Sequence, residues 1–190
     1  MKLHYKGKYD LKPESLPCKP HQPGAVPFKE AKDSKTLGLI ANTLAVLLII
    51  PLGIILDLRC GNAIFDYAFF GCIFAFLCLF PHELLHAVCF KGDVYLYTNL
   101  KQGMLFVVGP ETMSKGRFIF MSMLPNLLFG FIPYIIGLIT PTLSVLGVFG
   151  AISICMGAGD YYNIFNAATQ MPKGARTYLY QFNSFWYMPD

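Results

Sequence analysis

The side chains best placed to do chemistry are two histidines and a glutamate in the stretch Pro81–His86, which reads PHELLH and lies within a long apolar run. On a helix, residues four apart project from the same face, so His82 and His86 can bind one metal ion, with Glu83 beside them. Zinc in catalytic sites usually takes three protein ligands and leaves one position for water. The spacing therefore predicts a zinc site with Glu83 as general base, and a third ligand from elsewhere in the chain.

The apolar setting decides between this interpretation and a chance match. The His-Glu-x-x-His pattern specifies only three residues, so it also occurs by chance on the solvated helices of many soluble proteins that bind no metal there. Near the middle of a membrane helix, however, a charged residue costs about 2.5–3.5 kcal/mol on insertion scales and usually marks a functional site. We therefore favour a metal site, with one zinc ion per chain, although His and carboxylate ligands also accept Fe²⁺, Co²⁺ or Mn²⁺.

Composition places the chain in the membrane class. Of its 190 residues, 55% are hydrophobic and only 14% are charged, and the mean hydropathy is +0.49. The net charge of +4 arises mostly from lysines near the N-terminus. A basic segment beside a membrane explains this charge more simply than nucleic acid does, so the predicted partners are the lipid bilayer and no nucleic acid.

Apolar runs predict the fold class and the domain boundaries. About 20 apolar residues are needed to cross a bilayer, and the sequence predicts an all-α integral membrane protein with about four transmembrane helices. We expect a mostly irregular, Lys- and Pro-rich segment at 1–36, a membrane domain at 37–168 and a C-terminal segment at 169–190. The predicted spans are 37–56, 67–90, 118–139 and 143–168, with a polar turn at 57–66.

The polar region from Lys91 to Arg117 contains two short β-prone runs, at 94–97 and 104–108. This pattern is typical of a β-hairpin. The hairpin is either a plain connector between the second and third spans or an exposed strand edge that pairs with an extended peptide.

The distribution of Lys and Arg predicts the orientation. Basic residues are frequent before the first span and between the second and third, and they are absent between the third and fourth. By the positive-inside rule, both termini, the hairpin loop and the mouth of the site are cytoplasmic in a multi-pass protein of the cell membrane.

Asp160 is the candidate third ligand. It precedes the end of the fourth span by eight residues, and the histidines precede the end of the second by four to eight, so at a rise of about 1.5 Å per residue both lie roughly 6–12 Å from the cytoplasmic side. An unpaired carboxylate in hydrocarbon is costly, although a helix-terminal aspartate that merely binds Tyr or Asn neighbours is the alternative. Asn163 and Asn166 continue the same helix face, and Asn126 follows a proline, so these amides are candidate substrate or metal-shell groups.

These residues give the chain a resemblance to a known family, the small membrane zincin peptidases, which are similar in plan to site-2 intramembrane metalloproteases. The match rests on His82–His86 late in one span, Gly159-Asp160 late in a following one, the intervening loop, and Leu124-Pro125. It covers residues 64 to 168 and leaves the N-terminal segment outside. The resemblance implies zinc ligands at His82, His86 and Asp160 and a catalytic Glu83.

The chain departs from the site-2 proteases at the third ligand. Their ligand helix carries an Asn-Pro-x-x-x-x-Asp-Gly type of motif, whereas here Tyr161 follows Asp160 and no proline precedes it nearby. The resemblance therefore implies the ligand role of Asp160 but not the substrate handling of the site-2 proteases.

The predicted function is a zinc-dependent membrane metallopeptidase that cuts a polypeptide in or near the membrane, with Glu83 activating a zinc-bound water. A non-catalytic membrane scaffold or regulator with a structural metal site is the alternative. A metal or proton transporter is a weaker alternative. A transporter would be expected to have polar residues at several depths in the membrane, whereas here they cluster at one depth.

Overall fold

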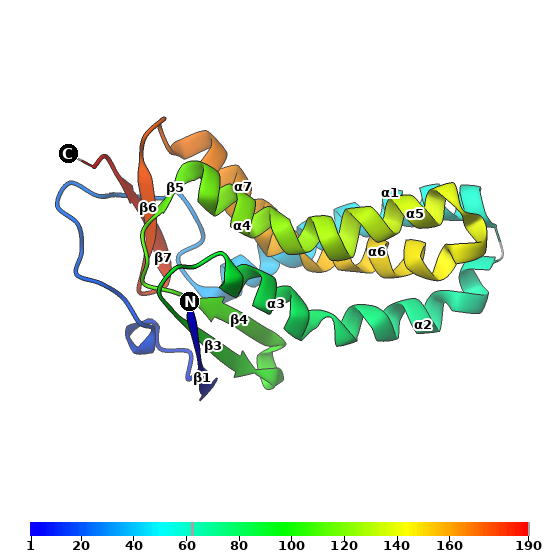
Figure 1. Cartoon of the computed structure of the whole chain (residues 1–190), viewed down its shortest axis with the longest axis horizontal. Coiled ribbons are helices and arrows are strands. Elements are labelled where there is room, and N and C mark those ends of the chain that lie inside the picture. Colours follow the sequence, from blue (N-terminus) through cyan, green and yellow to red (C-terminus); the bar gives the residue numbers. More distant parts are fainter. Residues whose placement is uncertain (62, 190) are drawn as a thin grey trace.

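A helical bundle joins a β-rich end that carries both chain termini (Figure 1). The computed structural model describes residues 1–61 and 63–189. Its α-helices are α1 (Ser34–Cys60), α2 (Ala63–Leu77), α3 (Leu79–Val88), α4 (Lys115–Pro125), α5 (Ile132–Ile139), α6 (Ser144–Met156) and α7 (Ala158–Gln170). A π-helical segment, η3 (Asn126–Phe131), joins α4 to α5, and the short 3-10 helices are η1 (Pro13–Ser15), η2 (Leu100–Gln102) and η4 (Pro141–Leu143).

The predicted spans correspond to helices of membrane length. Three helical runs are long and apolar enough to cross a membrane, namely Ser34–Cys60, Tyr67–Val88 and Lys115–Ile139. The pair α6 and α7, bent by 52°, makes a fourth if it is counted as one span. The predicted polar turn at 57–66 is shorter than expected, because α1 continues to Cys60 and α2 begins at Ala63; Asn62 of that turn lies outside the described residues.

Two sheets lie at one end of the bundle, so the prediction of an all-α protein does not hold. The first sheet has the strand order β1 (Lys2–Lys8), β3 (Asp93–Asn99), β4 (Met104–Val108). The second has the order β2 (Val26–Pro27), β7 (Asn183–Tyr187), β6 (Arg176–Tyr180), β5 (Met113–Ser114). The predicted hairpin is confirmed, since β3 and β4 pair antiparallel with Leu96 opposite Val107.

The N-terminal segment is more ordered than predicted. β1 pairs in parallel with β3, from Lys2 opposite Asp93 to Lys8 opposite Thr98. Further along, the side chain of Phe28 is buried in a cluster with Ala167 of α7. These partners are more than 80 residues away along the chain, so no local pattern predicts them. Most of the segment is irregular as expected, but β1 is a strand and Phe28, although in irregular structure, is packed against α7.

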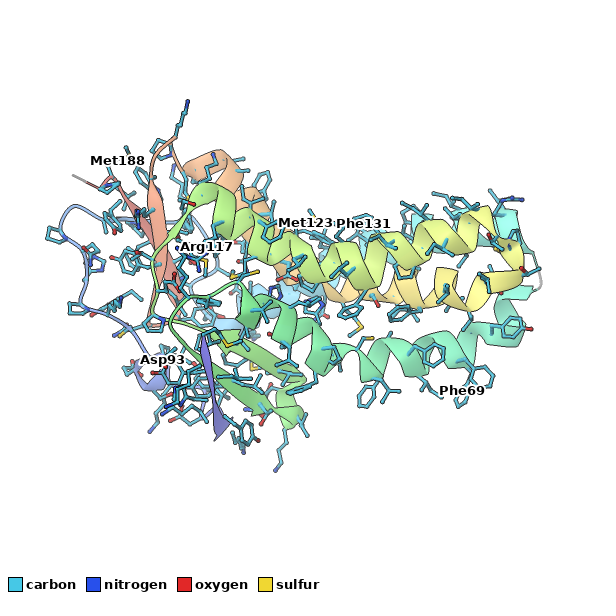
Figure 2. All side chains as sticks on the ribbon, in the orientation of Figure 1. Phe69, Asp93, Arg117, Met123, Phe131 and Met188 are labelled. Carbon is cyan, nitrogen blue, oxygen red and sulfur yellow. The ribbon has the colours of Figure 1, made fainter. Side chains whose placement is uncertain are left out.

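The bundle combines close helix contacts inside with large apolar side chains outside. Gly150 of α6 lies so close to the backbone of Tyr134 in α5 that a side chain at this position would overlap it, and small residues of this kind let membrane helices approach. On the outside, large apolar side chains are exposed. Phe69 of α2, 69% exposed, points away from the bundle in Figure 2, as expected of a surface in contact with hydrocarbon.

Candidate metal centre

Three donor groups from two distant helices converge at the junction of bundle and sheets. His82 and His86 lie one turn apart on α3, and their Nε2 atoms are 3.2 Å from each other. Asp160 of α7 approaches both, with Oδ2 at 3.1 Å from His82 Nε2 and Oδ1 at 3.3 Å from His86 Nε2. The predicted depth match between these residues therefore corresponds to direct contact.

The separations between the donor atoms fit a tetrahedral zinc ion. At a metal–ligand distance of about 2.0–2.1 Å, tetrahedral geometry places two ligand atoms about 3.3–3.4 Å apart. The two Nε2 atoms are 3.2 Å apart, and each faces its own oxygen of Asp160, His82 at 3.1 Å and His86 at 3.3 Å, all close to this value. The side chains are also largely shielded, with exposed fractions of 15% for His82, 9% for His86 and 15% for Asp160. Two imidazoles and one carboxylate in a shielded site are a suitable donor set for Zn²⁺.

The backbone of α4 fixes the orientation of His86. Its Nδ1 lies 2.9 Å from the carbonyl oxygen of Met121. Because a carbonyl only accepts, Nδ1 must carry the proton, and in the neutral ring Nε2 is left with a free lone pair. Ligating histidines commonly donate their second ring N–H to such a partner, so this ring is oriented for metal binding.

Asp160 is held in place by Asn126 of η3. The Asn126 side-chain amide donates to Asp160 Oδ2 at 2.7 Å and to the carbonyl of Ser122 at 3.0 Å. Its oxygen accepts from the Tyr161 hydroxyl at 3.3 Å. Gly157, at the bend between α6 and α7, makes room for this amide, because an added Cβ would overlap the Asn126 side chain.

Glu83 lies beside the three donors and is held by a strand. Its Oε2 accepts a hydrogen bond of 3.0 Å from the backbone N–H of Val107 in β4. A carboxylate oxygen of Glu83 is also within 4.8 Å of a ring nitrogen of His82 and of His86. The Glu83 carboxylate therefore lies next to the two histidines and is oriented by a backbone amide of β4.

The three asparagines that the sequence singled out have different places. Asn126, which is 1% exposed, is the partner of Asp160. Asn163 lines a neighbouring cavity. Asn166 is buried and accepts a hydrogen bond from Gln170 on its own helix, and among the described residues neither Asn163 nor Asn166 hydrogen-bonds to a donor of the centre.

A cavity of about 700 Å³ reaches the edge of this centre. Its wall includes Val107, whose N–H binds Glu83, and Gly159, which precedes Asp160. Other parts of the wall come from the first turns of α1, from β4 and from β6. The cavity thus borders α1, the edge of β4 and the residue before Asp160, while the donor side chains and Glu83 are not among the residues that line it.

Sequence reasoning did not identify the Met121 carbonyl or the Val107 amide. Both are backbone groups, which every residue of their kind carries, so no residue type at these positions signals the role. The sequence gives Tyr161 no role beyond following Asp160, and its hydrogen bond to Asn126 depends on the fold.

Comparison with known proteins gives one match. Residues 75–176 match the model of a protein family described as "Putative zincin peptidase". A search of curated proteins and a search of solved structures found no match to the chain. The matched region covers more than half of the chain and includes α3, β4, α4, η3 and α7, which together carry the donors, Glu83 and the groups that orient them.

Proposed function

The chain belongs to the zincin peptidase family, and from that premise we propose that it is a zinc-dependent membrane peptidase that hydrolyses a peptide bond in or next to the bilayer. The family match confirms the resemblance drawn from the sequence. The observation that carries the proposal is the convergence of His82, His86 and Asp160 at separations that fit zinc, with Glu83 beside them. A likeness to site-2 proteases in particular stays a prediction.

We assign the third ligand to Asp160. Glu83 is the competing candidate, because it too lies close to both histidines. Two contacts favour Asp160: its two oxygens lie at 3.1 and 3.3 Å from the two Nε2 atoms, and Asn126 fixes its orientation. Glu83 is instead bound by the amide of Val107, which leaves its carboxylate next to the ligand set as a proton carrier.

The chain's own residues supply the remaining parts of the reaction. When bound, zinc would supply the Lewis acidity that activates a water molecule and polarises the scissile carbonyl. Glu83 would take the proton from the attacking water and deliver it to the leaving amine. The N–H of Val107 would hold the Glu83 carboxylate in position during both transfers, and the low exposure of His82 and Asp160 would limit competing water.

The edge of β4 is the proposed binding surface for the polypeptide substrate. β4 is the outer strand of its sheet, and the Val107 N–H points to Glu83 and away from β3. Because backbone groups alternate along a strand, the N–H and C=O of Leu105 also point outward, toward the cavity that Leu105 and Val107 both line. An extended peptide added here would pass Glu83 directly.

We propose a cytoplasmic location for this end of the molecule. Both sheets and both termini lie at the same end (Figure 1), and Glu83 of the centre is bound to β4 at that end. The segments there, 1–35, 91–117 and 173–176, carry most of the basic residues. The substrate would therefore be a membrane-embedded or membrane-adjacent polypeptide cut near the cytoplasmic face.

The metal content of the purified protein tests this proposal. Elemental mass spectrometry of the wild type should find about one zinc per chain, and His86→Ala and Asp160→Ala should lose it. Glu83→Gln should retain the zinc and lose peptide cleavage. Loss of zinc from Glu83→Gln but not from Asp160→Ala would exchange the two roles. Full activity of Glu83→Gln, or a wild type without metal under conditions that spare labile zinc, would overturn the enzyme and favour the scaffold alternative.

A further inference from the structure

The charged residues in the wall of the cavity are all acidic. Among the described residues that line it, the charged ones are Glu30 and Glu111, and none is a lysine, arginine or histidine. Glu111 is already neutralised, since its Oε1 forms an ion pair with Arg117 and its Oε2 accepts from the backbone N–H of Lys91 and Gly92. Glu30 is therefore the carboxylate whose charge a ligand in the cavity would meet.

Glu30 is oriented by the protein but not neutralised by it. Its Oε1 accepts from the backbone N–H of Ser184 and from the side-chain amide of Asn183. No basic side chain among the described residues forms an ion pair with it. Burial raises the pKa of Glu30, and these two hydrogen bonds only partly oppose the effect, so a cation that approached the carboxylate would relieve the desolvation of its charged form.

Glu30 and the proposed substrate surface on β4 line the same cavity. The residue that follows it, Ala31, donates its backbone N–H to the Tyr162 hydroxyl of α7 at 3.0 Å. Tyr162 lies on α7 one turn from Gly159, and both line the same cavity as the outer edge of β4. A strand on β4 would thus have Glu30 within the cavity that receives its side chains.

We propose that Glu30 determines specificity by binding a lysine or arginine side chain of a membrane polypeptide that lies along β4. The inference rests on the proposed peptidase function and names the class of substrate. A basic residue fits this wall because its methylene stem can lie on the apolar lining while its charged head reaches the carboxylate.

The expected substrates carry such residues where the cavity lies. Lysine and arginine are enriched in polypeptides just cytoplasmic of a membrane span. The cavity is lined by Ser34, Leu37 and Ala41 of the first turns of the membrane helix α1. A membrane polypeptide that unwinds at its cytoplasmic end would therefore present a basic residue at the level of Glu30.

Single-span model peptides can test this in lipid vesicles. The full chain is loaded with zinc and reconstituted in phosphatidylcholine vesicles with one of three peptides, identical except for Lys, Gln or Glu in the flank next to the span. Binding is measured by photo-crosslinking in a Glu83→Gln background, and cleavage is measured separately in the chain with Glu83 intact. Glu30→Gln keeps a side-chain oxygen for the Ser184 N–H, and Glu14→Gln, at an exposed position outside the cavity, is the matched control.

We expect the Lys peptide to bind about tenfold better than the Gln peptide, as a charged hydrogen bond predicts. Glu30→Gln should abolish this preference, Glu30→Lys should shift it to the Glu peptide, and Glu14→Gln should leave it unchanged. Cleavage without a preference that depends on Glu30 would overturn the inference and leave the peptidase standing. If binding shows a preference that depends on Glu30 but cleavage does not exceed the Glu83→Gln level, the Glu30 inference stands and the peptidase function is overturned. The absence of both binding and cleavage would overturn the inference and the proposed function together.

Discussion

Asn126 donates a hydrogen bond of 2.7 Å to Asp160 and thereby ties the π-helical segment η3 to α7 at the metal centre. Both of its amide protons and its carbonyl oxygen have partners, because it also donates to Ser122 and accepts from Tyr161. A fully bonded, buried amide has one orientation available. The carboxylate of Asp160 is therefore aimed at the two histidines before any metal binds.

Substitution of Gly157 should weaken zinc binding without changing a ligand. In Gly157→Ala, the new Cβ would overlap the Asn126 side chain and move it away from Asp160. Loss of such an outer partner typically costs about 10–100-fold in metal affinity, which chelator competition would measure. Gly159→Ala is the matched control, because a Cβ there meets nothing within 4 Å. Equal zinc affinity in the two variants would show that Asn126 does not support the site.

Proline at Leu105 should impair substrate binding and spare the metal. The outward N–H of Leu105 is not needed for pairing with β3, and an edge strand tolerates proline on its outer side. If the substrate adds to β4, Leu105→Pro removes one hydrogen bond to it, and KM for a peptide substrate should rise about five- to tenfold. Zinc content and thermal stability should stay near those of the wild type. An unchanged KM would exclude strand addition at this edge.

The Glu111–Arg117 pair should contribute stability that depends on pH. Burial opposes ionisation of Glu111, but the Arg117 guanidinium and the amides of Lys91 and Gly92 outweigh it and hold the pKa of this carboxyl below its ordinary value. A lowered folded-state pKa stabilises the fold above the unfolded pKa of about 4.3 and loses this contribution as the pH falls through the folded value. Glu111→Gln should thus lose about 1–3 kcal/mol at pH 7.

Thermal unfolding in detergent would measure this difference. The melting temperatures of the wild type and Glu111→Gln should differ by several degrees at pH 7, and the gap should narrow as the pH falls below the unfolded pKa of about 4.3 and close below the folded pKa. The exposed Glu14 provides a control, since Glu14→Gln should not change the melting temperature at either pH. A difference in melting temperature that persists at low pH would mean that the charge of Glu111 does not provide the stabilisation.

Labelling of single cysteines would establish the orientation in the membrane. Lys101, in the turn between β3 and β4, and Thr142, in the turn between α5 and α6, are both exposed. The β3–β4 hairpin belongs to the β-rich end, whereas α5 and α6 meet at the far end of the bundle (Figure 1). With the exposed Cys18 and Cys72 replaced by serine, an impermeant maleimide added to intact cells should label Thr142→Cys and not Lys101→Cys. The opposite result would place the metal centre on the outer side.

The features predictable from the sequence are those that depend on neighbours along the chain. The common face of His82 and His86 follows from helical periodicity, and the hairpin follows from two β-prone runs. Asp160 could be singled out because the cost of a carboxylate in an apolar run does not depend on what surrounds it in space. These arguments identified the residue types of the centre and their approximate depth.

Tertiary structure decided how those residues are held. The pairing of β1 with β3 and of β6 with β7 formed sheets that the residue pattern did not announce, and breaks at Cys78 and Gly157 divided two predicted helices. The Met121 carbonyl and the Val107 amide orient His86 and Glu83, yet every peptide unit carries the same groups. Residue type alone determines what chemistry is available here, whereas the choice of backbone atom at the centre depends on contacts between segments far apart in the chain.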